Sequence, residues 1–390
     1  MHKNIKLFYW SSFLVDFNFL GPVAILYYSH VSGSFALGMS IFSIVMLAQA
    51  ILELPTGIYS DKIGRIKTIR LEAIIRCLAF FFYLIAPSYL YLVIGAILEG
   101  TARAFGSGNN EALLYDSLAD TNSKNEYEHF LGRTSSMEQF AAAAVAIVGS
   151  VIAHFSWTWV LFLSFIPQLI RVIIGFKFTQ PKTYIPSEVN IYAHTKEAII
   201  IFFQNPKLRN ISIASMLGFA FSESGYQFRA AFVTTLWPVW AIGISRMLSS
   251  IGAAVSFWWS GKILRKIESL KLLILEKFFS STINFISYLI PTVFSPVLLT
   301  STSLFYGVTT VAKSSLMQKE FSDKQRATMG SLNSLGGSLV FAGYSFMLGL
   351  FADKIGPAKA LVITQVLSLL LVYFYWKAFV HQKHLSVVKN

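Results

Sequence analysis

Charged residues are scarce in this chain. They make up only 13% of its 390 residues, whereas soluble domains carry roughly 25%, so a water-soluble fold is excluded. Cysteine is nearly absent as well, because Cys77 stands alone, and this excludes a disulfide framework and a thiolate metal cage. The sequence also lacks a Gly-rich phosphate loop ending in Lys-Ser or Lys-Thr, which argues against ATP as the direct energy source.

Histidine is sparse and badly placed for metal chemistry. The seven His lie near the ends of apolar segments or in connections, at positions such as His30 and His154, so mid-membrane haem or metal ligation is not expected. The sequence predicts no cofactor and no metal site. The net charge of +13 is not gathered into a basic run outside the apolar segments, so nucleic acid is not expected as a partner.

Hydrophobic residues, by contrast, make up 55% of the chain and aromatic residues 15%. Apolar runs bounded by Gly, Pro and charge predict twelve membrane-spanning helices, each of which needs about 20 residues. The runs lie near residues 6–30, 34–59, 69–87, 88–118, 132–154, 157–178, 208–233, 237–260, 270–291, 293–320, 328–350 and 359–380. Too little chain remains for a sizeable domain outside the lipid bilayer, so we expect an all-α membrane protein.

The distribution of Lys and Arg supports this number of spans. If both termini are cytoplasmic, 23 of the 32 Lys and Arg lie in cytoplasmic segments, and the opposite loops hold only Lys354 and Lys359. Cytoplasmic loops of membrane proteins collect positive charge. We therefore expect a multi-pass protein of the cytoplasmic (inner) membrane with both termini in the cytoplasm.

The longest connection, residues 179–207, divides the predicted spans six and six. We expect an N-terminal six-helix bundle over residues 1–178 and a C-terminal one over residues 208–390. Residues 188–204 could form a short helix on the membrane surface, as a strut or as a regulatory element.

An internal echo suggests repetition. Residues 57–64 and 349–356 both read Gly-x-x-x-Asp-Lys-Ile-Gly, and they follow the second and the eleventh span, on opposite sides of the membrane by count. Related sequence at opposite faces is typical of inverted repeats. Each bundle is therefore expected to contain two inverted three-helix repeats.

The segment that follows the second span carries a resemblance to a known family. It reads Glu-Leu-Pro-Thr-Gly-Ile-Tyr-Ser-Asp-Lys-Ile-Gly-Arg-Ile-Lys over residues 53–67, which is similar to the signature between helices 2 and 3 of the major facilitator superfamily. Weaker matches occur at 111–118, 205–209 and 326–331. The resemblance implies a fold of two six-helix bundles and secondary active transport. Residues 146–152 lack the Gly-Pro pair of many drug antiporters, which disfavours an exporter.

The signature also suggests a cytoplasmic latch. Gly57 and Gly64 permit a close helix approach and a sharp turn, Asp61 can accept hydrogen bonds from the first amides of a neighbouring helix, and Arg65 can pair with a carboxylate. The resemblance implies Asp116 as its partner. The latch would hold the outward-facing state closed, although these residues could instead only fix topology.

Ionisable residues within a span mark candidate sites, because burying a charge in the bilayer costs roughly 2.5–3.5 kcal/mol. In the N-terminal half, Asp16 lies midway along the first span. Glu99 and Arg103 are four residues apart, on one face of a helix, and Asn110, eleven residues on from Glu99, returns to that face. The pair is either part of a cavity or a self-neutralised strut.

The C-terminal half offers a second set. Glu223 and Gln227 repeat the four-residue spacing beside Tyr226, and Tyr306, Thr310 and Lys313 form one stripe. Helices 1, 4, 7 and 10 line the central cavity in the family, so the resemblance implies that the groups of both halves converge.

Roles follow from these positions. Asp16 has no positive neighbour on its own helix, so it is the first candidate for proton coupling, followed by Glu99 and Glu223. Arg103 and Lys313 favour an anionic or zwitterionic solute. The remaining substrate-binding candidates are Asn110, Tyr226, Gln227 and Tyr306. We interpret three other buried cations as structural, namely Arg76, Arg171 and Lys277.

The leading hypothesis is a proton-coupled secondary active transporter, not an enzyme, which acts as a monomer on a small solute such as a carboxylate metabolite or siderophore. A proton-coupled multidrug efflux pump is the alternative within the same class. A channel and a polytopic membrane enzyme are alternatives of another class; the latch disfavours the channel, and the short outer loops disfavour the enzyme.

Overall fold

The computed structural model describes residues 3–107, 109–120, 123, 126–181, 202, 205–320 and 326–387. Within these ranges the secondary structure is helical, and seven helical stretches are long and apolar enough to cross a membrane by themselves. The predicted surface helix at 188–204 lies outside the described residues, apart from Phe202.

The chain divides into two compact units. The N-terminal unit comprises residues 1–188 and 238–246, and the C-terminal unit comprises residues 189–237 and 247–390. The short segment 238–246 packs on the N-terminal unit although it follows the seventh span.

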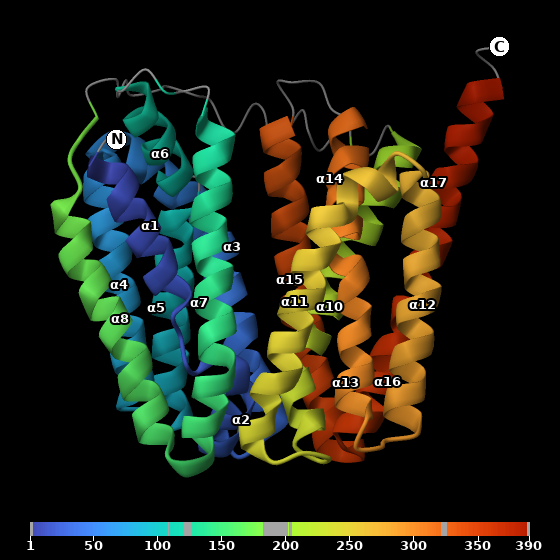
Figure 1. The fold of residues 1–390 in the computed structure, drawn as a ribbon, viewed down its shortest axis with the longest axis horizontal. Coiled ribbons are helices and arrows are strands. Elements are labelled where there is room, and N and C mark those ends of the chain that lie inside the picture. Colours follow the sequence, from blue (N-terminus) through green and yellow to red (C-terminus); the bar gives the residue numbers. More distant parts are fainter. Residues whose placement is uncertain are drawn as a thin grey trace. The chain divides into compact units, whose positions relative to one another are not determined.

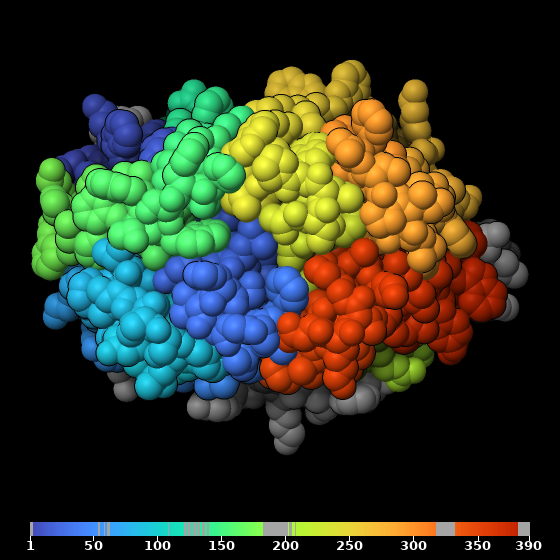
Figure 2. All heavy atoms as spheres, turned by 90° about the horizontal axis from the view of Figure 1, so that it is seen from below, coloured from blue at the N-terminus to red at the C-terminus, as the bar shows by residue number. Residues whose placement is uncertain are grey.

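The N-terminal unit contains six spans, the first and the fourth of which are each built from two helices (Figure 1). Its elements are α1 (Lys3–Asp16), η1 (Gly21–Val23), α2 (Ala24–Ser32), α3 (Phe35–Ile63), α4 (Arg65–Leu84), α5 (Tyr89–Gly106), α6 (Asn109–Ala119), α7 (Tyr127–Phe155) and α8 (Trp157–Lys177). Figure 2 looks onto the end where the α2–α3, α4–α5 and α7–α8 links of this unit lie side by side.

The C-terminal unit also accounts for six spans, of which the second begins in segment 238–246. Segment 238–246 of the N-terminal unit holds η3 (Val239–Ala241) and the first residues of α11 (Ile242–Leu264). Besides the rest of α11, the elements of the C-terminal unit are α10 (Pro206–Val233), α12 (Ser269–Leu289), α13 (Ser295–Thr300), η4 (Ser301–Phe305), α14 (Tyr306–Glu320), α15 (Arg326–Ile355), α16 (Pro357–Ser368) and α17 (Leu370–Val387). Asn205 caps the first of them by accepting a 3.0 Å hydrogen bond from the Leu208 amide.

Two links show why short sequences suffice to reverse the chain. Gly33 ends α2 with φ +79°, and the Ser34 side chain then accepts from the Leu37 amide at the start of α3. Gly64 and Gly356, the last residues of the two echoing segments, adopt nearly the same backbone, with φ/ψ of 91°/153° and 85°/161°. A residue with a Cβ is strained at such angles, so the echo reproduces one helix–turn–helix geometry.

Four of the predicted spans are not continuous helices. The first is interrupted at 17–20, the fourth between Gly106 and Asn109, the tenth by η4, and the twelfth at Leu369. At the first interruption, side chains of α8 bind the freed backbone groups of residues 14 and 20, and composition alone does not reveal such a contact between distant residues.

Each unit has its own apolar core. In the N-terminal unit, buried residues of α1, α4, α6 and α7 pack together; they include Ile5, Phe8, Ile69, Leu113 and Phe130. In the C-terminal unit, a cluster joins α10, α12, α14 and α17 through residues such as Ile211, Leu273, Ala312 and Tyr375. These cores hold the interrupted helices in place.

Candidate functional site

The break in the first span places Asp16 at the end of a helix inside the N-terminal unit. Asp16 is the last residue of α1, and its carbonyl oxygen accepts a 2.7 Å hydrogen bond from the Asn18 amide. The Leu20 amide donates to Oδ1 of Asn18 at 3.0 Å and to Oγ of Ser164 on α8 at 3.1 Å. The freed backbone groups therefore find polar partners, as a break at membrane depth requires.

Two further contacts hold the break. Nε2 of Gln168 on α8 donates to the Leu14 carbonyl at 3.3 Å. On the other side, Gly149 of α7 lies so close to the carbonyl of Phe19 that a Cβ at residue 149 would collide with it. Discontinuous helices with satisfied backbones are typical of ion and substrate sites in transporters.

Two ion pairs lie near this break. Nη2 of Arg171 on α8 donates to both carboxylate oxygens of Glu72 on α4, at 2.9 and 3.0 Å, and both side chains are 3% exposed. Nε and Nη2 of Arg103 donate to Oε1 of Glu99 at 3.1 and 2.7 Å. The pairing neutralises both arginines.

The Glu99–Arg103 pair is only partly shielded. Oε2 of Glu99 accepts a 2.9 Å hydrogen bond from the Tyr83 hydroxyl, and the Glu99 side chain is 9% exposed. The side chain of Arg103 is 36% exposed. The pair thus combines features of both sequence interpretations, a strut at Glu99 and an accessible cation at Arg103.

A second carboxylate accompanies Asp16. Glu138 on α7 forms a hydrogen bond with Ser12 and interacts electrostatically with Asp16, Arg76 and Arg171. Asp16 in turn interacts with Arg76, Arg103 and Arg171. The sequence analysis missed Glu138, although a carboxylate within the fifth apolar run was a signal for it.

Arg76 has a different environment from Arg171. Its residue is 8% exposed, and its buried Nε has no hydrogen-bond partner among the described residues. The interpretation of Arg171 as structural agrees with its pairing to Glu72. Arg76 instead lies within the electrostatic reach of Asp16, Glu72 and Glu99.

The argument that placed Asn110 on the face of Glu99 is wrong, because the helix does not continue between them. Ser107 is extended, and its hydroxyl donates to Oε1 of Glu53 on α3 at 2.9 Å. Asn110 belongs to α6, where its buried Oδ1 has no partner within the described part of the chain.

The latch residues lie at the α3–α4 junction and on α6. Nε of Arg65, the first residue of α4, is 3.9 Å from Oδ2 of Asp116, and their side chains are 20% and 22% exposed. Gly57 lies within α3, with nothing within 4 Å of the position of a Cβ, and Gly64 makes the turn. Asp61 belongs to α3, but its side chain lies outside the described part of the structure.

In the C-terminal unit, the structure brings Glu223, Gln227 and Tyr306 together. Nε2 of Gln227 donates to Oε1 of Glu223 at 2.7 Å, both on α10. Tyr306 begins α14, after the η4 interruption, and interacts electrostatically with Glu223 and Tyr226. Tyr226 and Tyr306 are 41% and 59% exposed, so their rings are available for contact.

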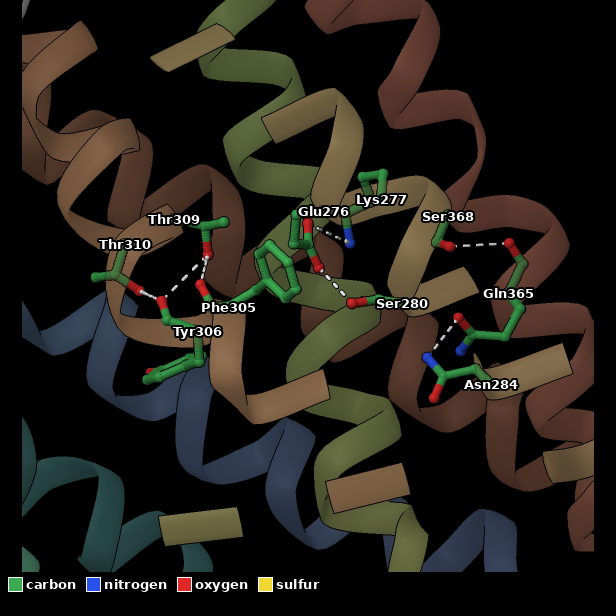
Figure 3. Close-up of polar contacts among 10 residues, drawn as sticks. All are labelled: Glu276, Lys277, Ser280, Asn284, Phe305, Tyr306, Thr309, Thr310, Gln365 and Ser368. Carbon is green, nitrogen blue, oxygen red and sulfur yellow. Dashed lines mark hydrogen bonds and ion pairs between the residues drawn. The ribbon is translucent and has the colours of Figure 1, made fainter. Parts of the chain in front are cut away.

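Lys313 lies elsewhere in the same unit. It shares α14 with Tyr306 and Thr310, whose hydroxyl donates to the Tyr306 carbonyl at 2.8 Å (Figure 3). Its charged neighbours are Glu276 and Lys277 of α12. The expected convergence of the groups from the two halves stays a prediction.

Comparison with known proteins identifies the fold. The sequence matches the family model of the Major Facilitator Superfamily over residues 7–343. The structure of the nucleoside transporter NupG is similar, with a TM-score of 0.79, 16% identity, and coverage of 97% of this chain and 99% of that one. The structure of the D-xylose-proton symporter is also similar, with a TM-score of 0.74, 11% identity, and coverage of 95% of this chain and 96% of that one. A third similar structure is a bacterial homolog of the human lysosomal transporter Spinster in its inward-facing, unoccupied conformation. Its TM-score is 0.73 at 15% identity, and the match covers 96% of this chain and 95% of that one. No curated protein matches the sequence.

Proposed function

Because the chain belongs to the Major Facilitator Superfamily, a family of membrane transporters with twelve spanning helices, we propose that it couples protons to the movement of a small solute. The solute is anionic or zwitterionic, such as a carboxylate metabolite or a carboxylate siderophore. It crosses the cytoplasmic membrane by alternating access of two six-helix bundles, residues 1–178 and 208–390. The transporter works as a monomer with both termini in the cytoplasm.

The charge balance around Asp16 is the observation that carries proton coupling. Among the described residues, four carboxylates and three guanidiniums interact electrostatically in the interior of the N-terminal unit: Asp16, Glu72, Glu99 and Glu138 with Arg76, Arg103 and Arg171. Ion pairs occupy Glu72 and Glu99, so Arg76 is the described cation that is left for Asp16 and Glu138. An uncompensated buried charge is costly, and a neutral cluster therefore holds one proton.

Asp16 is the better carrier of this proton. It is the last residue of α1, at the break between α1 and α2, whereas Glu138 lies within the continuous α7. A tilt of α1 relative to α2 would change the distance between Asp16 and Arg76. Such a change would release or take up the proton, because the attraction between opposite charges falls with their separation.

The exposed side chain of Arg103, together with the positive charge of Lys313, supports an anionic group on the solute. Arg103 is 36% exposed, and no described residue accepts a hydrogen bond from its Nη1. Lys313 would supply a second positive charge. In the C-terminal unit, Glu223 offers a carboxylate beside the exposed rings of Tyr226 and Tyr306, a combination that suits the ammonium group of a zwitterion.

The test is transport by the full-length protein in liposomes that contain a pH-sensitive dye. The panel includes monocarboxylates, citrate, zwitterionic amino acids, a neutral sugar and the lipophilic cation tetraphenylphosphonium. We expect saturable uptake of an anionic or zwitterionic compound together with protons. Movement of the lipophilic cation alone would instead favour an efflux pump, and flux that does not saturate would favour a channel.

Asp16→Asn tests whether Asp16 carries the transported proton. The asparagine side chain is uncharged at every pH, so accumulation driven by a pH gradient should fall to the equilibrium level, while exchange down a solute gradient should persist. Glu138→Gln is the comparison variant, because it also removes one carboxylate from the same cluster but keeps a titratable group at residue 16. Asp16 then has Arg76 to itself and binds a proton less readily, so we expect accumulation that persists but requires a more acidic outer solution. If Asp16→Asn accumulates the solute normally and Glu138→Gln does not, Glu138 rather than Asp16 carries the proton.

A further inference from the structure

A compact group of charges on α12 is not used by the proposed coupling step. Nζ of Lys277 lies 3.8 Å from Oε2 of Glu276, and the Ser280 hydroxyl donates to Oε1 of Glu276 at 2.8 Å (Figure 3). Lys313 of α14 interacts electrostatically with both Glu276 and Lys277. Glu276 is therefore the carboxylate near both ammonium groups, and only the Lys277 ammonium lies within ion-pair distance of it among the contacts described.

The group is enclosed by the core of the C-terminal unit. The side chains of Glu276 and Lys277 are 13% and 10% exposed. Ala312, the neighbour of Lys313, packs in one apolar cluster with Leu273 of α12 and with Tyr375 of α17. Water is thus largely replaced by hydrocarbon around these charges.

Hydrogen-bond donors outnumber acceptors at this position. The Tyr375 hydroxyl is buried, interacts electrostatically with Glu276 and has no hydrogen-bond partner among the described residues. No hydrogen bond joins the ammonium group of Lys313 to any described acceptor. Each ammonium group carries three N–H donors, whereas the two carboxylate oxygens of Glu276 already face Ser280 and Lys277.

A single bound anion would compensate both the surplus positive charge and the surplus of hydrogen-bond donors. The group carries one surplus positive charge and several unsatisfied donors, and either feature is costly in a low-dielectric interior. One bound anion would supply both a negative charge and hydrogen-bond acceptors. A neutral ligand would satisfy donors but leave the charge.

We propose that Lys277, Lys313 and the Tyr375 hydroxyl form a binding site for a monovalent anion within the C-terminal unit, with Glu276 orienting the Lys277 ammonium. The shared chemistry is a compact anionic group. It is either a free inorganic ion such as chloride or the carboxylate of an organic solute. Only the carboxylate source rests on the proposed function.

Binding is measured as a rise in melting temperature, because a ligand that binds the folded state stabilises it in a saturable manner. The purified full-length protein in detergent is titrated separately with sodium chloride and with sodium acetate. A bulky sulfonate salt keeps the ionic strength constant. We expect a saturable rise with at least one of the two anions.

Lys277→Met and Lys313→Met should raise the half-saturating concentration at least about tenfold, since each removes one charge-assisted contact. Lys271→Met is the matched control, because Lys271 lies on the same helix but is exposed and pairs with Glu268, and it should bind like the wild type. Tyr375→Phe keeps both charges and nearly all of the volume, so it tests the site even where a lysine variant does not fold.

The outcomes separate the two sources. A response to acetate that also competes with transported carboxylates identifies a solute subsite. A response to chloride alone identifies an inorganic ion and removes Lys313 from the solute path without affecting the role of Asp16. Absence of a saturable response in the wild type, or an unchanged response in Lys313→Met and Tyr375→Phe, would overturn the proposal.

Discussion

Nη2 of Arg171 on α8 contacts both carboxylate oxygens of Glu72 on α4, at 2.9 and 3.0 Å, across 99 residues of sequence. Both side chains are 3% exposed, so water contributes little to their solvation. A pair of this kind adds little net stability, yet removal of one partner strands the other charge. The Glu72–Arg171 pair therefore fixes the position of α4 relative to α8.

Replacing one partner of this pair should destabilise the protein more than replacing both partners. Arg171→Met strands Glu72 and should cost about 3–5 kcal/mol of unfolding free energy. The double variant Glu72→Gln/Arg171→Met should recover a large part of the loss. Thermal unfolding of the detergent-purified variants measures both effects, and equal melting temperatures of the single and the double variant would contradict this account.

The Glu99–Arg103 pair should behave differently, because Arg103 is exposed enough to meet a solute. Arg103→Lys keeps the charge but loses the planar fork, so we expect weaker apparent affinity for the transported anion. Arg103→Ala should weaken it more. Initial uptake rates over a range of solute concentrations measure these changes.

Arg103→Ala also strands Glu99, which could impair folding. The informative comparison is therefore with Glu99→Gln/Arg103→Ala, after size-exclusion chromatography has shown that both variants are monodisperse. If the double variant transports an anionic solute as the wild type does, the pair is a strut, and Arg103 no longer supports the proposal that the solute is anionic.

The latch makes a prediction about the Arg65–Asp116 contact. Asp116→Asn should lower transport without preventing membrane insertion, because it removes the charge and keeps the volume. The reversed pair Arg65→Asp/Asp116→Arg should recover part of the activity if the two side chains act on each other. Losses that simply add in the double variant would show that they act independently.

The close contact between Gly149 and Phe19 predicts a steric effect on the break of α1. Gly149→Ala places a Cβ against the Phe19 carbonyl, and such overpacking costs about 1–3 kcal/mol. We expect a lower melting temperature and reduced accumulation. Gly343→Ala on α15 is the control, because nothing lies within 4 Å of its Cβ position, and its melting temperature should not fall.

Much of the architecture was predictable from local pattern. The apolar runs and the Lys and Arg distribution predicted an all-α membrane protein with twelve spans, because the bilayer demands a fixed length of apolar helix and cytoplasmic loops retain positive charge. The sharp turn predicted at Gly64 is confirmed, and Gly356 at the end of the echoing segment also has a positive φ, which glycine adopts without strain.

The site was less predictable, because it depends on contacts between distant residues. Asn110 was expected on the face of Glu99, but a break after Gly106 separates them. Glu138 was not considered at all, although it interacts electrostatically with Asp16. No local pattern states that Ser164 and Gln168 of α8 satisfy the broken end of α1.

The sequence by itself thus predicted the all-α membrane fold and the number of spans, and it identified ionisable residues within them. Tertiary structure decided which of these charges are neutralised. Arg171 and Arg76 are indistinguishable in sequence as arginines within apolar runs, yet Arg171 meets Glu72 and the Nε of Arg76 finds no described acceptor. The physical reason is that the energy of a buried charge depends on partners a few ångströms away, which packing alone brings together.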